Sequence, residues 1–348
     1  MTPGRLPVTP GRAAVLAIDG GNSKTDVALV GADGTLLAAV RGGGSNAHIV
    51  GLGPAMAIIG ELAGAAARQA GLPGGSRPIA VHVSACLAGA DLPEDEERLA
   101  GALRAGGWAT SCSVVNDTFA ILRAGLAPGL DSGPRHWGVA VTCGAGINCV
   151  AVAPDGREAR FPALGEITGD WGGGEGLGRA ALWWAIRDED GRGPQTMLRA
   201  AVAAHFGVPA ASDVGIGVHY GTIDESELAG LAPVVLRTAA LGDEIAGNLV
   251  ARLAEEVVTM AATMIRRLGL ARRAVPVILG GGLLTARDLL LTDGITHGLA
   301  ARAPAAFVRI VDVPAVAGAA LLGLDHLGAP AGAEQRLRAA YLTVTAAG

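Results

Sequence analysis

The sequence predicts an α/β protein in which one domain is duplicated. A short apolar run, a glycine turn, a second apolar run and an Asp-Gly hairpin signal follow one another twice along the chain. Gly20 and Gly144 lie 124 positions apart, and the hairpin signals Asp33-Gly34 and Asp155-Gly156 lie 122 positions apart. With 348 residues, of which 50% are hydrophobic, the chain is long enough for two such domains. Chance recurrence of strand, glycine turn and strand is the alternative interpretation.

The first predicted copy begins with three strands that two turns connect. After a glycine-rich loop at residues 42–46, apolar runs alternate with helical patterns. The charge run at residues 93–97 fits a solvated first turn of a helix, which the helix dipole favours. The expected strands cover residues 13–18, 27–30, 35–40, 78–84 and 113–115, and the expected helices cover 53–70, a segment that starts at 93, and 118–124.

The second copy starts near Trp137 and carries a helical segment that the first copy lacks. Apolar residues recur every three or four positions over residues 241–268, which predicts an amphipathic helix. The other expected elements are strands at 138–142, 149–153, 275–279 and 307–311 and helices at 180–186, 197–206, 315–324 and 333–342. We therefore expect one domain at 13–130 and a second at 131–330, with a helical insertion at 176–270. The C-terminal helix, within 331–348, is expected to pack back on the first domain.

Composition and charge exclude several classes of function. A net charge of −5 and an aromatic content of 3% argue against a nucleic-acid partner, which needs basic patches and stacking surfaces. No apolar run reaches about 18 residues, so we expect no transmembrane helix and no membrane partner. The first twelve residues lack the hydrophobic region of a signal peptide. Four cysteines without a C-x-x-C spacing predict small buried thiols, no metal cluster, and a reduced, cytoplasmic protein.

One short turn has the composition of a phosphate-binding site. The only lysine of the chain lies in the sequence Asp19-Gly20-Gly21-Asn22-Ser23-Lys24-Thr25. Glycines let backbone N–H groups approach an anion, and the hydroxyls and the lysine add donors. The turn is no Walker A loop, because Ser23 stands where a glycine is needed and both flanks have strand patterns. An ordinary hairpin turn with a chance lysine is the alternative.

Five motifs, taken in order, resemble those of one family. They are Asp19-Gly20-Gly21-x-x-Lys24-Thr25, Asn116-Asp117, Cys143-Gly144-Ala145-Gly146-Ile147-Asn148, Gly169-Asp170 and Leu279-Gly280-Gly281-Gly282. In these positions the sequence is similar to the BadF/BadG/BcrA/BcrD ATPases and, within them, to the N-acetylglucosamine kinases, over residues 13–325. Actin and the heat-shock chaperone ATPases belong to the same superfamily. The resemblance implies duplicated ribonuclease H-like (actin-like ATPase) domains with a central nucleotide and sugar cleft.

The resemblance also assigns nucleotide-binding residues. Asp19 would hold Mg²⁺, through water. Ala145 departs from the family, in which many relatives have a hydroxyl residue, so one phosphate hydrogen bond is in doubt. The implied ATP contacts are Gly20, Gly21, Asn22, Ser23, Lys24, Thr25, Gly144, Ala145, Gly146, Gly280, Gly281 and Gly282.

Asp117 matches the catalytic base of the family. A sugar hydroxyl must lose its proton as it attacks the γ-phosphorus, and a positioned carboxylate can accept that proton. The end of a strand is a rigid place for such a group. The alternative is that Asn116 and Asp117 cap a helix over residues 118–124.

Sugar recognition is implied for a second group of residues. By position the group consists of Asn46, Asp117, Ala163, Leu164 and Asp170. A carboxylate and an amide are natural partners for neighbouring hydroxyls, although a turn residue at Asn46 and a helix cap at Asp170 are the alternatives. The family sequence Gly-Gly-Trp-Gly is replaced by residues 162–165 here, and Trp171 follows Asp170, which puts the identity of the sugar in doubt. His48 is expected to face the sugar loop as well, although a lone histidine is more often structural.

The implied function is ATP-dependent phosphorylation of an amino sugar, N-acetylglucosamine or a relative, to the 6-phosphate. ATP and Mg²⁺ are the implied cofactors, a small sugar the substrate, and a homodimer the implied assembly. An ATPase activator of a radical dehydratase is the first alternative, but those proteins bridge a cluster with paired cysteines and no suitable pair stands out here. A relative that binds nucleotide or sugar without turnover is the second.

Overall fold

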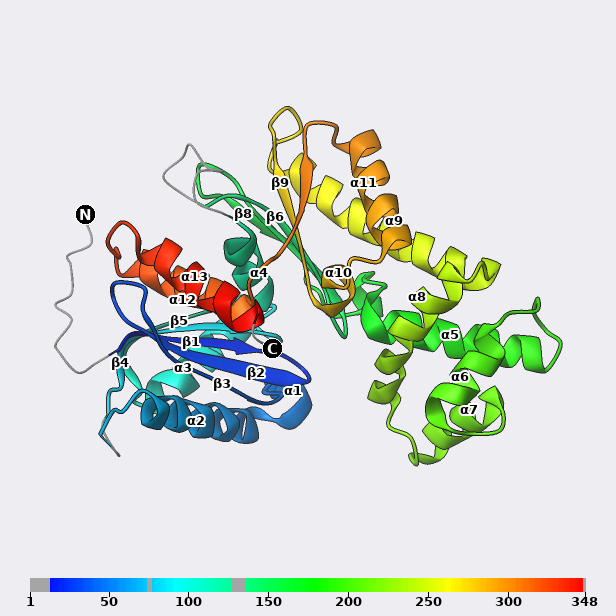
Figure 1. Cartoon of the computed structure of the whole chain (residues 1–348), viewed down its shortest axis with the longest axis horizontal. Helices are drawn as coiled ribbons and strands as arrows, with labels where there is room; N and C mark the ends of the chain where they lie inside the picture. The colour runs from blue at the N-terminus through cyan, green and yellow to red at the C-terminus, as the bar shows by residue number, and fades with distance from the viewer. Residues whose placement is uncertain (1–12, 74–76, 127–135, 347–348) are drawn as a thin grey trace. The chain divides into compact units, whose positions relative to one another are not determined.

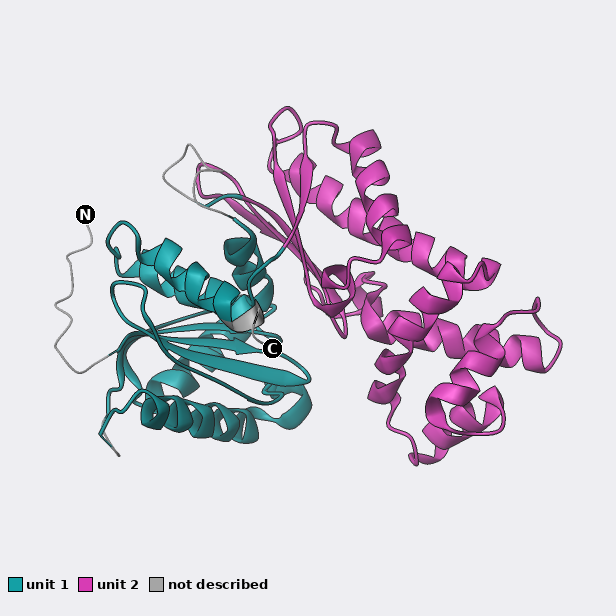
Figure 2. Ribbon diagram, viewed as in Figure 1, with its two compact units in different colours: residues 1–137, 311–348 teal, residues 138–310 magenta. Residues whose placement is uncertain are grey.

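The computed structural model describes residues 13–73, 77–126 and 136–346, which form two compact units. One unit comprises the chain up to residue 137 together with residues from 311 onward, and the other comprises residues 138–310 (Figure 2). The sequence predicted a return to the first domain at 331, whereas the structure returns at 311. The reason is that helix α12 (Ala315–His326) already packs against the first sheet and its helix α4 (Asp117–Gly125).

The first unit is built on a five-stranded mixed sheet with the order β3-β2-β1-β4-β5 (Figure 1). β1, β2 and β3 pair in antiparallel fashion, while β4 pairs in parallel with both β1 and β5. The strands are β1 (Ala13–Gly20), β2 (Lys24–Val30), β3 (Leu36–Gly43), β4 (Ala80–Leu87) and β5 (Ala109–Asn116). The remaining helices of this unit are α1 (Ala47–Val50), α2 (Leu52–Gln69), α3 (Pro93–Ala105) and α13 (Ala333–Ala346).

The second unit repeats that topology. Its sheet has the order β10-β9-β6-β7-β8, which is the order of the first sheet read from the opposite edge. The first three strands are again antiparallel neighbours, and the last two are again parallel to the first. The duplication that the two glycine hairpins predicted is therefore confirmed. The strands are β6 (Gly138–Cys143), β7 (Ile147–Val152), β8 (Glu158–Arg160), β9 (Pro276–Gly280) and β10 (Phe307–Ile310).

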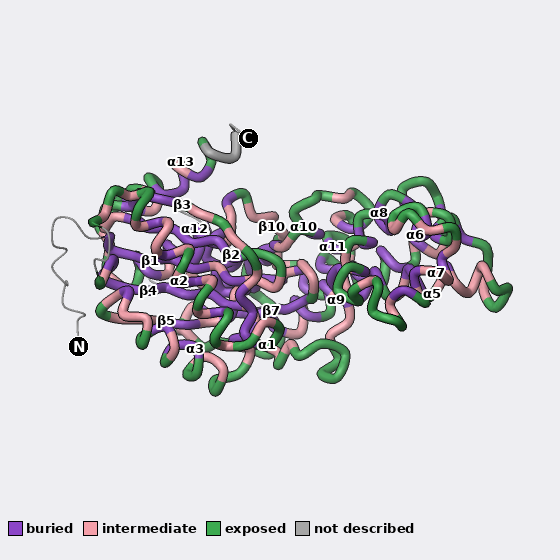
Figure 3. The backbone as a smooth tube through the Cα atoms, turned by 90° about the horizontal axis from the view of Figure 1, so that it is seen from below, coloured by how far each residue is buried: buried purple, intermediate pink, exposed green. Residues whose placement is uncertain are grey.

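Two hydrophobic cores cover the two faces of the first sheet. Successive residues of a strand point to opposite faces, and β1 shows the alternation: Leu16 and Ile18 join the core under α2 and α3, whereas Val15 and Ala17 join the core under α4, α12 and α13. Each of residues 13–18 of β1 is buried, as expected for a central strand of a sheet that is covered on both faces. Figure 3 shows the same concentration of buried residues along the strands.

The insertion of the second unit is helical, as predicted, but contains more helices than its sequence pattern indicated. The predicted helix at 180–186 is the middle of a longer helix, and the amphipathic segment forms one long helix. Within the described residues, no single helix is both long and apolar enough to cross a membrane, although α6 and α7 together form one bent pair that meets the criterion by length and composition. The helices of this unit are α5 (Gly173–Glu189), α6 (Leu198–Phe206), α7 (Ala211–Tyr220), α8 (Ala232–Ala240), α9 (Glu244–Arg267), α10 (Gly282–Thr285) and α11 (Leu289–Arg302), with short 3₁₀ turns at Glu166–Thr168 and Glu225–Leu231.

Close packing of α12 on α4 gives a first testable prediction. A Cβ atom at Gly318 of α12 would lie 1.9 Å from the carbonyl oxygen of Ala120, so the two helices can approach only because this position lacks a side chain. We expect Gly318→Ala to lower the free energy of unfolding by about 2 kcal/mol, because overpacking forces the backbones apart. The matched control is Gly101→Ala on α3, where a Cβ meets nothing within 4 Å.

The control should raise the stability by up to about 1 kcal/mol, since alanine is the better helix former. Urea unfolding of the two variants and the parent measures both changes. A Gly318→Ala variant as stable as the Gly101→Ala variant would contradict the close approach of these helices.

Candidate active site

The candidate site of the first unit lies where its parallel strands end. Because β1, β4 and β5 run in the same direction, their carboxyl ends meet at one edge of the sheet. The register places Asp19 beside Cys86, and Leu87 beside Asn116. The residues predicted for metal binding, for proton transfer and for the first phosphate turn are thus brought to one edge of this sheet.

Asp117 is the first residue of α4, but a neighbouring residue caps that helix. Asn116 Oδ1 accepts a hydrogen bond from the N–H of Thr118 at 2.9 Å, and Asn116 Nδ2 donates to Asp91 Oδ1 at 2.8 Å. The carboxylate of Asp117 has a long contact of 3.5 Å with the Thr118 hydroxyl. Burial raises the pKa of Asp117 to about 6. The capping alternative therefore applies to Asn116, and the Asp117 carboxylate has the setting of a proton acceptor.

Asp19 lies in a concentration of negative charge. Burial, followed by the charges of Asp117 and Asp26, raises the pKa of Asp19 to about 8, while Lys24 and Arg41 act in the opposite direction. Asp26 is the cross-strand neighbour of Asp19 and is held by Arg41 in a bidentate pair with N–O distances of 2.6 and 2.9 Å. Lys24 Nζ lies 3.9 Å from Asp26 Oδ2. Sequence reasoning missed Asp26 and Arg41, although a charged residue inside an apolar strand was the available signal.

This donor set fits a magnesium ion that is held together with a nucleotide. The described residues contain no cluster of three or more His, Cys, Asp or Glu side chains that could hold a metal ion alone. Magnesium prefers oxygen ligands, keeps several waters, and is commonly bound by one or two carboxylates plus substrate phosphates. Asp19 is the residue that would hold it, and a cation there would relieve the repulsion among the carboxylates.

The predicted phosphate turn connects β1 to β2, and part of it serves the protein itself. The N–H of Gly21 donates to the carbonyl of Lys24 at 2.8 Å, which closes the turn. Thr25 is fully buried, and its hydroxyl donates to Ser45 Oγ at 2.8 Å. A Cβ at Gly20 would lie 2.7 Å from both Ser45 Oγ and Leu87 Cδ2, so a larger residue there would displace these side chains. The Thr25 side chain thus serves an internal contact in this structure, whereas Ser23 and Lys24 are exposed.

Asn46 is the N-cap of α1 and is tied to the phosphate turn. Its Oδ1 accepts from the N–H of His48 at 2.9 Å, and its Nδ2 donates to Asn22 Oδ1 at 2.8 Å. The turn role that was the alternative for Asn46 is therefore present in the structure. His48 Nε2 lies 3.1 Å from the carbonyl oxygen of Gly89 and 3.3 Å from Asp95 Oδ1. These contacts give His48 a role in holding the loop.

In the second unit the structure brings the other two glycine turns together. The register pairs Thr142 with Gly280, so the turns that follow β6 and β9 lie at one edge of the sheet. Gly281 has φ +84°, and a Cβ there would lie 2.4 Å from the carbonyl oxygen of Cys143. Only glycine allows this approach. The turns predicted for the second phosphate contact and for adenosine are therefore neighbours within this unit.

The start of α5 is docked on the Gly144–Gly146 turn. The N–H of Gly174 donates to the carbonyl of Gly144 at 2.8 Å, and the N–H of Glu175 donates to the carbonyl of Ala145 at 2.9 Å. Two N–H groups from the first turn of a helix are satisfied in this way. The contact fixes the backbone of the turn at Ala145, the position where a family hydroxyl is missing.

Asp170 lies in the loop before α5 and does not cap that helix, because the N-cap is Gly172. Its Oδ2 accepts a hydrogen bond of 2.5 Å from the Thr168 hydroxyl. Trp171 is half-buried, and the Arg252 guanidinium of α9 stacks over its ring at 3.8 Å from the centroid. Ala163 has φ +53°, which is uncommon for a residue with a side chain, and Leu164 is exposed. The loop thus presents a carboxylate, a stacked tryptophan and an apolar side chain.

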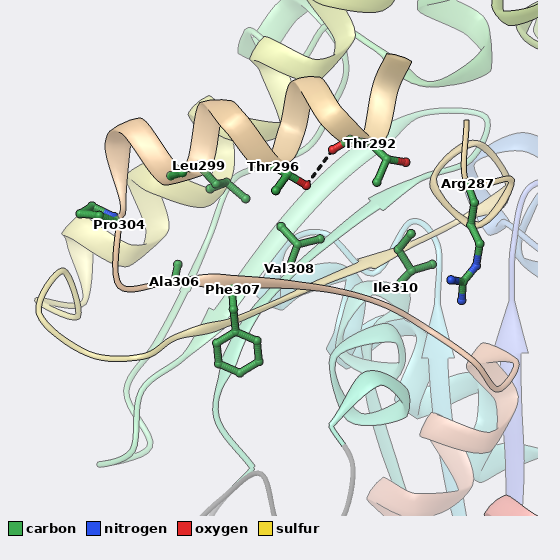
Figure 4. A pocket seen from close by; sticks show the side chains of 10 residues that line it. Arg287, Thr292, Thr296, Leu299, Pro304, Ala306, Phe307, Val308 and Ile310 are labelled. Carbon is green, nitrogen blue, oxygen red and sulfur yellow. Dashed lines mark hydrogen bonds between the residues drawn. The ribbon is translucent and has the colours of Figure 1, made fainter. Parts of the chain in front are cut away.

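A separate pocket of about 480 Å³ lies between α11 and β10 in the second unit (Figure 4). Phe307, Val308 and Ile310 line it from the strand, and Thr296 of α11 donates its hydroxyl to the carbonyl of Thr292. None of the predicted site residues lines this pocket.

The cysteines that are described in the structure are free thiols. Cys86, Cys143 and Cys149 are buried, as predicted, and Cys112 is half-buried. Burial raises the pKa of Cys143 to about 12 and also raises that of Cys86. These thiols are therefore poor nucleophiles and poor metal ligands at neutral pH.

Two units with this repeated sheet order, each with a glycine turn at the strand edge, define the class of actin-like ATPase folds. Within that class, the chain belongs to the BadF/BadG/BcrA/BcrD ATPase family, whose sequence pattern matches residues 16–323. The family assignment from the five motifs is confirmed.

Similar proteins carry sugar-kinase names. An N-acetylmuramic acid/N-acetylglucosamine kinase from Clostridium acetobutylicum is 26% identical over 272 residues, which are 78% of this chain and 85% of that protein. An N-acetyl-D-glucosamine kinase from Dictyostelium discoideum is 26% identical over 319 residues, or 89% and 97% of the two chains. A solved structure of a candidate N-acetylglucosamine kinase from Chromobacterium violaceum has a TM-score of 0.70 and 26% identity, and the match covers 90% of this chain and all of that one.

Proposed function

We propose that this protein is an ATP-dependent kinase that phosphorylates a hydroxyl group of an amino sugar, N-acetylglucosamine or a close relative. The observation that carries the proposal is the setting of Asp117. Its carboxylate is not the N-cap of α4, has a raised pKa, and lies at the strand edge that also carries Asp19 and the first phosphate turn. The names of the relatives support an amino sugar as the substrate.

In the proposed reaction Asp117 accepts the proton of the sugar hydroxyl while that oxygen attacks the γ-phosphorus of ATP. The new P–O bond forms as the bond to ADP breaks, and the proton later leaves Asp117 for solvent. In the first unit we assign Asn46 to sugar recognition and Ser23, Lys24 and the backbone of the first glycine turn to nucleotide binding. In the second unit we assign Asp170 to sugar recognition and the backbone of the other two glycine turns to nucleotide binding. Magnesium would neutralise developing phosphate charge when it is bound. We further propose the 6-phosphate as product, a homodimer, and a cytoplasmic location.

The test is ADP release from the full chain with ATP, magnesium and a panel of sugars. The panel contains N-acetylglucosamine, N-acetylmuramic acid, glucosamine and glucose. We expect an N-acetylated amino sugar to give the highest kcat/KM. Mass spectrometry and phosphorus NMR of the product identify the modified hydroxyl. If no sugar stimulates ADP release, the kinase proposal is wrong, and nucleotide binding without turnover would favour the non-catalytic alternative.

The pH profile follows from the raised pKa of Asp117. A general base acts when it is deprotonated, and kcat/KM reports the pKa of the free enzyme. Because burial raises that pKa to about 6, kcat/KM should fall tenfold per pH unit below about pH 6. An ordinary aspartate would hold its activity down to about pH 4. Initial rates of ADP formation, measured directly by chromatography between pH 4.5 and 9, check the prediction, and a profile that is flat down to about pH 4.5 would contradict it.

A further inference from the structure

The phosphate turn and the sugar loop of the first unit are joined by a set of side-chain and backbone bonds. Asn22 Oδ1 accepts from Asn46 Nδ2 at 2.8 Å, and the buried hydroxyls of Thr25 and Ser45 are hydrogen-bonded at 2.8 Å. The N–H of Ser45 also donates to the carbonyl of Gly21 at 3.1 Å. In the proposed reaction residues 20–25 bind the nucleotide and Asn46 binds the sugar. The structure thus joins residues 20–25 and 44–46 into one packed body.

We propose that Asn22 is a positioning residue for the sugar, acting through Asn46, rather than a ligand of the ATP phosphates. This inference rests on the proposed function, in which Asn46 binds the sugar. Sequence position placed Asn22 in the phosphate turn, but its side chain is directed to Asn46. The phosphate turn then contributes to the recognition of both substrates.

The hydrogen bonds of Asn46 fix which way its amide points. A side-chain amide has two N–H donors and an oxygen with two lone pairs. One donor is used by Asn22 Oδ1, and one lone pair is used by the N–H of His48. Within the described part of the chain, one N–H and one lone pair of Asn46 remain for a ligand, which suits a hydroxyl group that both accepts and donates. Without the Asn22 acceptor, the amide could rotate and present the wrong atoms.

The loops around Asn46 are packed closely against one another. Asn46 is buried, and a Cβ at Gly89 would lie 2.6 Å from its Oδ1 and 2.8 Å from the His48 ring. Gly44 lies against the turn on the other side, because a Cβ there would lie 1.8 Å from the carbonyl oxygen of Asn22. The N–H of Ala88 donates to the carbonyl of Gly20 at 2.7 Å, which ties the loop after β4 to the same body. The Asn46 amide thus lies where three loops meet, and its side-chain hydrogen bonds are those with Asn22 and with the N–H of His48.

The experiment compares substitutions at Asn22 and at its neighbour in the turn. Asn22→Leu keeps the approximate size and removes the acceptor, so the dissociation constant and the KM for N-acetylglucosamine should rise about tenfold, with a smaller change in kcat and in the KM for ATP. Asn22→Asp keeps an acceptor for Asn46 Nδ2 but adds a negative charge near the phosphates. This conservative variant should restore the sugar affinity while raising the KM for ATP.

Ser23→Ala is the matched control in the same turn. Ser23 is exposed, and its substitution should affect the KM for ATP more than the sugar affinity. Calorimetry without ATP gives the dissociation constants of N-acetylglucosamine and N-acetylmuramic acid, and thermal unfolding shows that each variant is folded. In the parent and in Asn22→Leu, the side-chain amide resonances of Asn46 report whether its hydrogen bond is lost.

The outcomes separate the two proposals. If the parent binds sugar but produces no ADP, the kinase proposal fails and the sugar affinities still test Asn22. If Asn22→Leu raises the KM for ATP and leaves the sugar affinity unchanged, Asn22 is a phosphate ligand and the inference is wrong. If Asn22→Leu and Asn22→Asp weaken sugar binding equally, the acceptor has no role and the inference is also wrong. A parent that binds no sugar overturns both.

Discussion

Replacing Asp117 with asparagine is expected to lower kcat by about three orders of magnitude, because positioned general bases contribute about 10²- to 10⁴-fold. Asparagine has nearly the same shape and cannot accept the proton. Since Asn116, not Asp117, caps α4, the substitution leaves the start of that helix intact. The KM values for ATP and sugar should change far less than kcat. Steady-state kinetics of the purified variant provide the measurement.

The same substitution should make the protein more stable at alkaline pH. The pKa of Asp117 is raised from its ordinary value of 3.8 to about 6, so the folded protein binds this proton more tightly than the unfolded chain. As pH rises from about 4 to about 6, ionisation of the buried carboxylate lowers the stability of the folded protein, and this loss is complete above about pH 6. Asp117→Asn removes about 2 to 3 kcal/mol of that cost at pH 8 and almost none at pH 4. It also removes a charge that raises the pKa of Asp19.

Asp33 provides a control of opposite sign. Hydrogen bonds from the backbone and side chain of Thr35 lower the pKa of Asp33, so its ionised form stabilises the folded state at neutral pH. Asp33→Asn should therefore reduce the stability at pH 8, where Asp117→Asn increases it. Thermal unfolding at pH 4 and pH 8 distinguishes the two. An Asp117→Asn variant that keeps the parental kcat would contradict the proton-acceptor role, and one destabilised at pH 8 would show that the carboxylate has a structural function.

The sequence predicted the architecture because the repeated unit is marked by local signals. Glycine turns, Asp-Gly hairpins and short apolar runs are properties of neighbouring residues, and they located every strand except the short β8. Several helices of the second unit were harder to predict. α11 has exposed leucines at 289 and 290, and α7 has exposed Ile216 and Tyr220. The apolar residues of these helices therefore do not recur at the three- and four-residue spacing of a buried helix face.

The candidate site was predictable in its residue types but not in its contacts. Asp19, Asp117 and the glycine turns follow from motifs, whereas the Asn22–Asn46 and Thr25–Ser45 pairs join residues 24 and 20 positions apart. Such pairs depend on how loops from different strands meet at the edge of the sheet. Whether Asn116 or Asp117 caps the helix likewise depends on side-chain rotamers, which the local amino-acid sequence does not specify. Tertiary packing decided each of these points.

A second large effect is expected at Arg123, which joins α4 to the C-terminal helices. Its side chain is only 2% exposed, and its guanidinium donates to both oxygens of Asp325 at 2.7 and 3.1 Å and to both oxygens of Glu334 at 2.9 Å. Arg338 of α13 also bonds Glu334 and donates to the carbonyls of Ala124 and Leu126 at the end of α4. The C-terminal return of the chain is thus attached to the helix whose first residue is Asp117.

Arg123→Met should lower the free energy of unfolding by about 3 kcal/mol, because removing one partner of a buried ion pair leaves the carboxylates without compensation. Arg336→Met is the matched control on α13. The Arg336 pair with Asp33 is exposed, and its loss should cost less than about 1 kcal/mol. Because α4 carries Asp117, we also expect kcat to fall in Arg123→Met and to be retained in Arg336→Met. Urea unfolding and steady-state kinetics measure the two effects.

The pH dependence of the Arg123 effect identifies its cause. Burial opposes the ionisation of Asp325, but hydrogen bonds from His136 and Arg123 outweigh it and lower its pKa to about 2, and the same arginine lowers the pKa of Glu334. Stability from depressed carboxylate pKa values is complete above about pH 5 and is lost as pH falls toward about 2. The difference between parent and Arg123→Met should therefore shrink over that range. A difference that stays constant would mean that Arg123 acts by filling space, since packing does not titrate.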